Sequence, residues 1–167
     1  MSKNKYILGI DPGSKSGAAA VVYVDEDGAL RGEAEDLPTI SKFGRSRVSP
    51  VGFNQWLQSL SFFPTEAWIE DVHAMPRDSA KGAFAFGHSV GSIEGIIAAL
   101  SIPYQFVAPS KWQKSVLTRT VGKNHEFIRS FACGLFPDVD LRYKKDHNKA
   151  SALLIAYYGL NRDRKND

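Results

Sequence analysis

Cysteine is almost absent from this sequence, and so are long apolar runs. The 167 residues include one cysteine, Cys133, which excludes an internal disulfide and a zinc site built from several cysteines. No segment reaches the roughly 18 consecutive apolar residues of a membrane-spanning helix. The opening residues MSKNKY also lack the apolar core of a secretory signal. We therefore expect a cytoplasmic, intracellular protein with no membrane partner.

The sequence also lacks internal repeats and any linker that would divide it. A chain of 167 residues with 43% hydrophobic residues is about the size of one domain and can bury a core without disulfides. We therefore predict a single domain over residues 1–167. Segment 40–50 is rich in serine and basic residues and has no hydrophobic period, so we predict a mobile loop there.

The hydrophobic pattern predicts an α/β fold. The predicted strands are 6–10, 17–24, 29–38, 67–70 and 102–107, and the predicted helices are 51–60, 79–100, 109–117, 124–137 and 149–160. Three hairpin-connected strands come first, followed by alternating strands and helices. This order predicts a mixed sheet, with antiparallel and then parallel pairing and with helices on its faces.

Positive charge is concentrated in one part of the chain. The net charge is +3, but the segment from Gln105 to Ala150 has nine lysines and arginines against four acids. That segment is either an ordinary solvated surface or a face that binds phosphates.

Two acids directly follow apolar strands. Asp11 follows the first strand and Glu70 ends the fourth, and a carboxylate at the edge of a buried strand costs several kcal/mol unless something pairs with it. Asp146, followed by His147, precedes the last helix. A single acid of this kind is most simply a cap or a surface ion pair. Converging carboxylates would need a divalent cation, and oxygen ligands suit Mg²⁺ or Mn²⁺. Two such ions can promote attack of water on a phosphodiester.

Several segments together resemble a known family. They are GIDPGSKSGAAAV, WIEDVHAMP, the glycine-rich helix, VAPSKWQK and DHNKASALLIAYYG, in this order from Ile7 to Gly159. The chain resembles the RuvC-like Holliday-junction resolvases, especially phage and organellar-type relatives. The resemblance implies an RNase H-like fold, a five-stranded mixed sheet with helices on both faces. It also implies a homodimer that nicks two strands of a four-way DNA junction symmetrically, using two Mg²⁺ ions, or Mn²⁺, held by four acids.

The family's acids map only partly onto this chain. Asp11 matches the first and Glu70 the second, but Ser151 stands where the family has an aspartate in the last helix. Helical spacing puts Asn148 or His147 on the face of Ser151, and because asparagine is a poor cation partner we expect Asp146 or His147 to be the other ligand. The predicted catalytic residues are Asp11, Glu70, Asp146, His147 and Ser151. The predicted metal ligands are Asp11, Glu70, Asp146 and Ser151.

The resemblance also implies a DNA-binding surface. Lys114 and Lys123 match family lysines near the scissile phosphate, and His73 stands where relatives often have an aromatic wedge that stacks on an unpaired base. The remaining lysines predicted to bind DNA are Lys111, Lys144, Lys145 and Lys149.

Three functions stay open at this point. The first is a structure-selective endonuclease impaired by Ser151, the second a junction-binding protein without catalysis, and the third an actin-like ATPase half. Against the third function, the chain has no second lobe and no evident glycine-rich adenosine site.

The long helix carries two further expectations. Gly87, Gly91 and Gly95 share one face, which predicts close packing on another helix and, through the resemblance, a two-fold dimer. Of Phe84 and Phe86, we expect at least one in the core.

Overall fold

The central element is a five-stranded mixed sheet. The computed structural model describes residues 4–119, 122 and 124–162. The strand order is β3–β2–β1–β6–β7. The strands are β1 (Ile7–Asp11), β2 (Ala18–Val24), β3 (Leu30–Asp36), β6 (Glu66–Glu70) and β7 (Tyr104–Val107). The first three pair antiparallel, and β1–β6 and β6–β7 pair parallel, as the sequence predicted.

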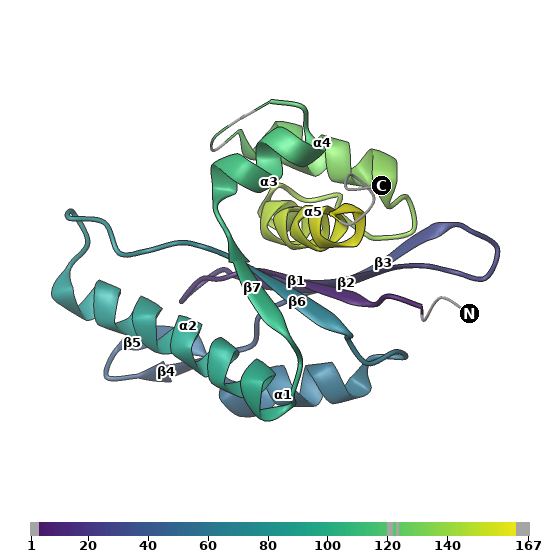
Figure 1. Ribbon diagram of the computed structural model, residues 1–167. Coiled ribbons are helices and arrows are strands. Elements are labelled where there is room, and N and C mark those ends of the chain that lie inside the picture. The colour runs from purple at the N-terminus through teal and green to yellow at the C-terminus, as the bar shows by residue number, and fades with distance from the viewer. Residues whose placement is uncertain (1–3, 120–121, 123, 163–167) are drawn as a thin grey trace.

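Helices cover both faces of this sheet (Figure 1). The helices are α1 (Pro50–Ser59), α2 (Ala80–Ala99), α3 (Pro109–Val116), α4 (His125–Leu135) and α5 (His147–Asn161), with a short 3-10 turn, η1 (Lys144–Asp146), before α5. The pair α1 and α2 lies on one face, and α3, α4 and α5 lie on the other. The predicted RNase H-like arrangement is confirmed.

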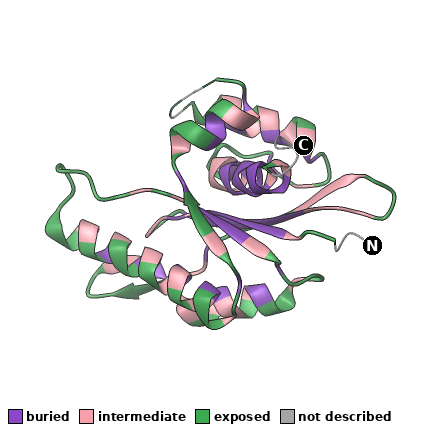
Figure 2. Ribbon diagram, in the orientation of Figure 1, coloured by how far each residue is buried: buried purple, intermediate pink, exposed green. Residues whose placement is uncertain are grey.

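The apolar run in β1 is continuous because the strand is buried from both sides. Ile7 packs toward α5, whereas Leu8 and Ile10 pack toward α1 and α2. Alternate side chains of a strand point to opposite faces, so two separate cores meet at this strand. Figure 2 shows the central strands and α5 buried and most of the outer helix surfaces exposed.

Helix α5 lies directly against β1 at a glycine. A Cβ atom built on Gly9 would stand 2.2 Å from the carbonyl oxygen of Ala152 and 2.8 Å from Cβ of Ala156. Only a glycine on the strand, facing alanines on the helix, permits this approach. Helix α5 is largely buried as a result. In the described part of the chain, no helix is long and apolar enough to cross a membrane.

Segment 40–50, where the sequence predicted a mobile loop, is largely a β-hairpin with regular strands, and mobility there stays a prediction. Strands β4 (Thr39–Lys42) and β5 (Arg45–Val48) pair antiparallel as a separate two-stranded sheet. Phe43 and Gly44 form the turn with φ values of 54° and 70°, the positive φ angles that a tight hairpin turn requires. Strands of four residues are too short to show a clear alternation in sequence.

Within this chain, helix α2 buries a face that does not include Gly87, Gly91 or Gly95. Its buried residues are Ala85, Ser89, Ile93 and Ile97. Phe84 is 74% exposed and Phe86 is half-buried outside both cores, so the prediction that one of them is a core residue is wrong. No atom lies within 4 Å of a Cβ built on Gly87, Gly91 or Gly95. No helix of the described chain therefore packs on that glycine face.

We predict that Gly9→Ala destabilises the protein by about 1–3 kcal/mol, the usual cost of overpacking a core. The methyl group would push α5 away from β1. Thermal unfolding followed by circular dichroism should show a melting temperature lower by about 2–4 °C per kcal/mol.

The matched control is Gly134→Ala on the exposed side of α4, where an added Cβ meets nothing. It should be neutral or stabilising by up to about 1 kcal/mol. Equal effects of the two variants would contradict the close contact.

Candidate active site

Asp11 and Glu70 lie side by side because their strands are parallel neighbours. Ile10 pairs with Ile69 in the register of β1 and β6, and the two acids are the next residues of those strands. Both contribute to the wall of a cavity of about 420 Å³. The parallel register therefore brings the two carboxylates together at neighbouring strand ends.

Helices from the α5 side of the sheet complete the cavity. Asn148 and Ser151, one helical turn apart on α5, line it together with Trp112 of α3 and His125 of α4. The other lining residues are Val72, Pro109, Ser110, Gln113, Gly122 and Ile128.

Asp11 is the more perturbed of the two acids. Burial and, after it, the negative charge of Glu70 raise the pKa of Asp11 well above its ordinary value, while a hydrogen bond with the Ser151 hydroxyl lowers it. Desolvation and a neighbouring like charge both disfavour the carboxylate form. The neutral hydroxyl of Ser151 offsets only part of this cost, so the site favours a proton or a cation at Asp11.

Glu70 is held by a tryptophan that the sequence analysis did not single out. The indole Nε1 of Trp112 donates a hydrogen bond of 2.8 Å to Oε1 of Glu70. Burial raises the pKa of Glu70, and the bond from Trp112 lowers it. Trp112 is itself fully buried, so it restrains the orientation of this carboxylate.

The start of α5 places its polar residues differently from the expectation. Asp146 is buried, but it does not line the cavity, because Oδ2 accepts a 2.8 Å bond from the backbone N–H of Tyr143 and Oδ1 lies 3.8 Å from Nζ of Lys149. His147 Nδ1 lies 3.0 Å from the carbonyl oxygen of Lys144. The ring of His147 contacts that of His125, with 4.1 Å between centroids, and of these two only His125 lines the cavity.

Those predicted DNA-binding residues that the structure describes lie outside the cavity wall. Lys111 and Lys114 are exposed on α3, Lys144 and Lys145 are exposed on η1, and His73 is exposed in the connection from β6 to α2. Lys149 is half-buried between Asp36, at 3.9 Å, and Asp146. Lys123 lies outside the described residues.

The donor atoms around Asp11 fit one hard divalent cation better than two. Two carboxylates, an amide oxygen from Asn148 and the hydroxyl of Ser151 are oxygen donors of the kind that Mg²⁺ and Mn²⁺ prefer. Their two negative charges balance one divalent ion and leave a second uncompensated. Within the described ranges, no group of three or more His, Cys, Asp or Glu side chains could hold a metal.

Asn148, Trp112 and His125 are the site residues that the sequence analysis did not assign. Helical spacing did identify Asn148 as a possible neighbour of Ser151, but because asparagine is a poor cation partner we expected Asp146 or His147 instead. A buried tryptophan next to an acid gives no sequence signal, because the two are 42 residues apart.

The raised pKa of Asp11 predicts a pH-dependent effect on stability. An acid whose pKa is raised on folding costs stability progressively as the pH rises from its ordinary pKa to the raised one, and the full cost remains above the raised pKa. Without metal, Asp11→Asn should therefore raise the melting temperature at about pH 8 and change it little at about pH 4, near the ordinary value for Asp. Calorimetry in EDTA measures this difference.

A control of opposite sign is Asp140→Asn, because Arg142 lowers the pKa of Asp140 on the surface. That variant should not raise the melting temperature at about pH 8. If Asp11→Asn destabilises equally at both pH values, Asp11 does not carry a buried, poorly compensated charge.

Structural comparison finds Holliday junction resolvases that cover more than nine-tenths of this chain, whereas no protein-family model and no curated protein matches its sequence. RuvC of Thermus thermophilus is 20% identical over 96% of both chains, with a TM-score of 0.68. T. thermophilus RuvC in complex with a Holliday junction substrate is 16% identical over 97% of this chain and 96% of that chain, with a TM-score of 0.73. The fowlpox virus Holliday junction resolvase is 14% identical over 97% of this chain and 99% of its own, with a TM-score of 0.57. The chain therefore has the RNase H-like fold of RuvC and other Holliday junction resolvases.

Proposed function

We propose that this protein is a structure-selective endonuclease that binds four-way DNA junctions and hydrolyses phosphodiesters with a divalent cation. The observation that carries the proposal is the pair Asp11 and Glu70, side by side at parallel strand ends in a cavity of this fold. The fold neighbours include Holliday junction resolvases in complex with junction DNA, which supports the substrate class. The protein would work inside the cell.

Asp11 and Glu70 would hold the cation, with the oxygens of Ser151 and Asn148 as neutral partners. When bound, Mg²⁺ or Mn²⁺ would stabilise negative charge on the reacting phosphate and lower the pKa of a coordinated water. Trp112 fixes one oxygen of Glu70 through its 2.8 Å hydrogen bond. The raised pKa of Asp11 means that a proton competes for this carboxylate, so loss of binding at low pH follows from the site itself.

A second candidate function, junction binding without efficient cutting, is favoured by two specific residues. Asn148 and Ser151 are neutral at the cavity wall where two further carboxylates would complete a four-acid site. The missing negative charge would weaken a second divalent ion most. We therefore propose that the chain as it stands binds junctions and cuts them slowly.

We also propose a homodimer that would place two active sites on one junction and nick two strands symmetrically. Gly87, Gly91 and Gly95 form a face of α2 on which nothing in the described chain packs. A second copy of α2 could approach such a face closely, and a two-fold axis would match the symmetry of a four-way junction.

Restoring negative charge should restore cutting. We predict that Ser151→Asp raises Mg²⁺-dependent cleavage of a synthetic four-way junction by at least about a hundredfold, the order of one lost electrostatic contact in catalysis. Addition of Asn148→Asp should raise it further. The measurement is single-turnover nicking of an end-labelled junction, with both strands followed.

Two controls accompany this experiment. Asp11→Asn in the Ser151→Asp background should abolish nicking while junction binding in EDTA persists. If the unaltered chain nicks as fast as Ser151→Asp, Ser151 does not occupy a vacated ligand position. If the unaltered chain does not bind four-way junctions, the proposed substrate is wrong.

A further inference from the structure

His125 lines the active-site cavity, but the proposed cation site leaves it without a role. It is the first residue of α4 and lies on the cavity wall with Asp11 and Glu70. The side chain of Asn124 fixes the start of this helix by accepting a 3.1 Å hydrogen bond from the N–H of Phe127. Helix α4 covers the same face of the sheet as α5, so it brings an imidazole to the cavity from that side (Figure 1).

A second histidine contacts the ring of His125. The two ring centroids lie 4.1 Å apart, and Nδ1 of His147 lies 3.0 Å from the carbonyl oxygen of Lys144. His147 does not line the cavity, so it contacts His125 from outside the cavity wall. Although His125 is an exposed residue, this contact restrains its imidazole next to the cavity.

The other uncharged polar side chains of the wall are poorly suited to give up a proton. Trp112 donates its indole N–H to Glu70. The amide of Gln113 donates to the carbonyl oxygen of Gly122 at 3.1 Å and accepts from its N–H at 3.0 Å. Asn148 and the two lining serines are not residue types that enzymes commonly use as general acids, whereas histidine is the commonest.

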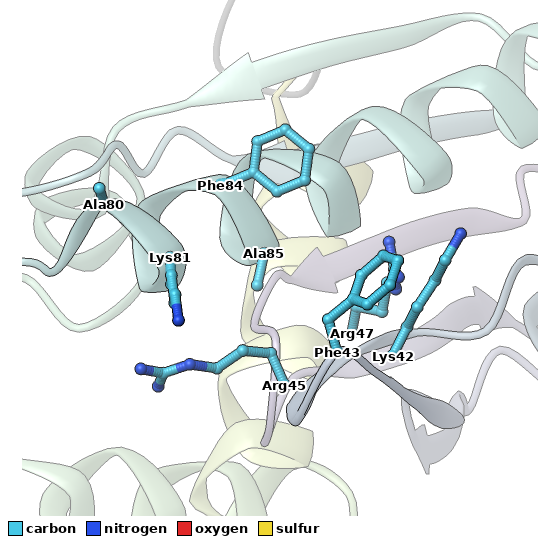
Figure 3. Close-up of a pocket in the computed structure, with 8 residues that line it drawn as sticks. All are labelled: Lys42, Phe43, Arg45, Arg47, Ala80, Lys81, Phe84 and Ala85. Carbon is cyan, nitrogen blue, oxygen red and sulfur yellow. The ribbon is translucent and has the colours of Figure 1, made fainter.

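No lysine or arginine lines this cavity among the described residues. Positive side chains instead line a separate pocket between the β4–β5 hairpin and the start of α2, which shares no lining residue with the cavity (Figure 3). The cations of that pocket are Lys42, Arg45, Arg47 and Lys81. Within the described chain, no permanent positive charge therefore lines the cavity where a phosphodiester would react.

Hydrolysis of a phosphodiester places negative charge on the sugar oxygen that leaves. Two divalent ions can stabilise the attacking and the leaving oxygens together. The two carboxylates of this cavity balance only one such ion, so the leaving oxygen needs a proton from another group. A general acid that supplies this proton typically accelerates a reaction by about 10²–10⁴-fold.

We propose that His125 is the general acid of this site and gives a proton to the leaving sugar oxygen. The inference rests on the proposed function and deepens it. Water forms a bond to phosphorus and loses a proton to solvent, while the bond from phosphorus to the sugar oxygen breaks and leaves its electron pair on that oxygen. The imidazolium of His125 gives that oxygen a proton and then regains one from solvent. A cavity of about 420 Å³ is small for a ligand site, so groups on opposite walls can contact one phosphodiester.

The test compares His125→Asn, which removes the acid, with His125→Arg, which keeps a positive charge that cannot be given up as a proton. The control is Ser130→Ala, on an exposed part of α4 that does not line the cavity. The substrates are a four-way junction and two versions of it with sulfur in place of the 3′ or the 5′ bridging oxygen at the mapped nicking sites. A thiolate is a far weaker base than an alkoxide, so it leaves without a proton.

Single-turnover nicking in Mn²⁺ should separate these variants. His125→Asn and His125→Arg should nick the ordinary junction at least about a hundredfold more slowly than the unaltered chain, the lower end of the effect of a general acid. Both should nick one of the two sulfur junctions about as fast as the unaltered chain does, and that junction identifies the bond that breaks. Ser130→Ala should match the unaltered chain on every substrate.

Two measurements independent of cutting show whether His125 has a different role. Binding of Mn²⁺, followed by the EPR signal of the free ion, should be unchanged in His125→Asn. Junction binding in EDTA, followed by fluorescence anisotropy, should also persist. Loss of either would make His125 a cation ligand or a DNA-binding residue and would overturn the inference.

The remaining outcomes separate the general acid from the proposed function. Equal nicking by His125→Asn and the unaltered chain, slow nicking of both sulfur junctions, or full activity of His125→Arg would each overturn the general acid and leave the nuclease intact. If Ser151→Asp nicks junctions and the unaltered chain does not, His125 supplies no step in this chain and only the inference fails. If neither protein nicks a junction, the proposed hydrolysis fails and the inference fails with it.

Discussion

The close contact between β1 and α5 determines the chemistry of this protein. Because Gly9 has no side chain, the backbone of α5 lies against the strand at Ala152 and Ala156. This contact fixes the rotation of α5 about its axis. It therefore brings Ser151 to Asp11 and places Asn148, one turn earlier, on the same cavity wall. Parallel pairing of β1 with β6 then adds Glu70 from the other side.

This geometry explains why the site lowers the stability of the metal-free protein and at the same time favours a bound cation. Two half-buried carboxylates raise each other's free energy when ionised, and the bonds from Ser151 and Trp112 offset that only in part. A divalent cation bound there would relieve the repulsion, and the stability lost in the metal-free protein would then contribute to the binding free energy of the ion. Because the α5 side contributes only neutral oxygens, one cation suffices to balance the site.

The sequence predicted the structure well where residues close together in the chain determine it. A continuous apolar run ending in Asp11, and a second ending in Glu70, identified two central strands and the two acids of the cavity. The sequence did not predict in the same way which residues at the start of α5 face the cavity. A 3-10 turn precedes the helix and uses the carboxylate of Asp146 to bind the backbone of Tyr143, so the acid nearest in sequence is taken up locally. Asn148 occupies the position at the cavity instead.

Features that depend on long-range packing were also missed. The hairpin β4–β5 is anchored by the buried Val48, whose N–H donates a 3.1 Å bond to the hydroxyl of Ser89 on α2. That partner lies 41 residues away and gives no signal in the segment itself. The same packing directs Ala85 and Ser89 inward, so that Phe84 is left exposed.

The central claim is that Asp11 and Glu70 form a site for one divalent cation, with Asn148 and Ser151 as its neutral neighbours. Crystals soaked in Mn²⁺ and measured at the manganese absorption edge test it most directly. The account predicts one anomalous peak in each chain, coordinated by Asp11 and Glu70. A second peak of equal height at the site, a peak bound by Asp146, or no peak near Asp11 would contradict it.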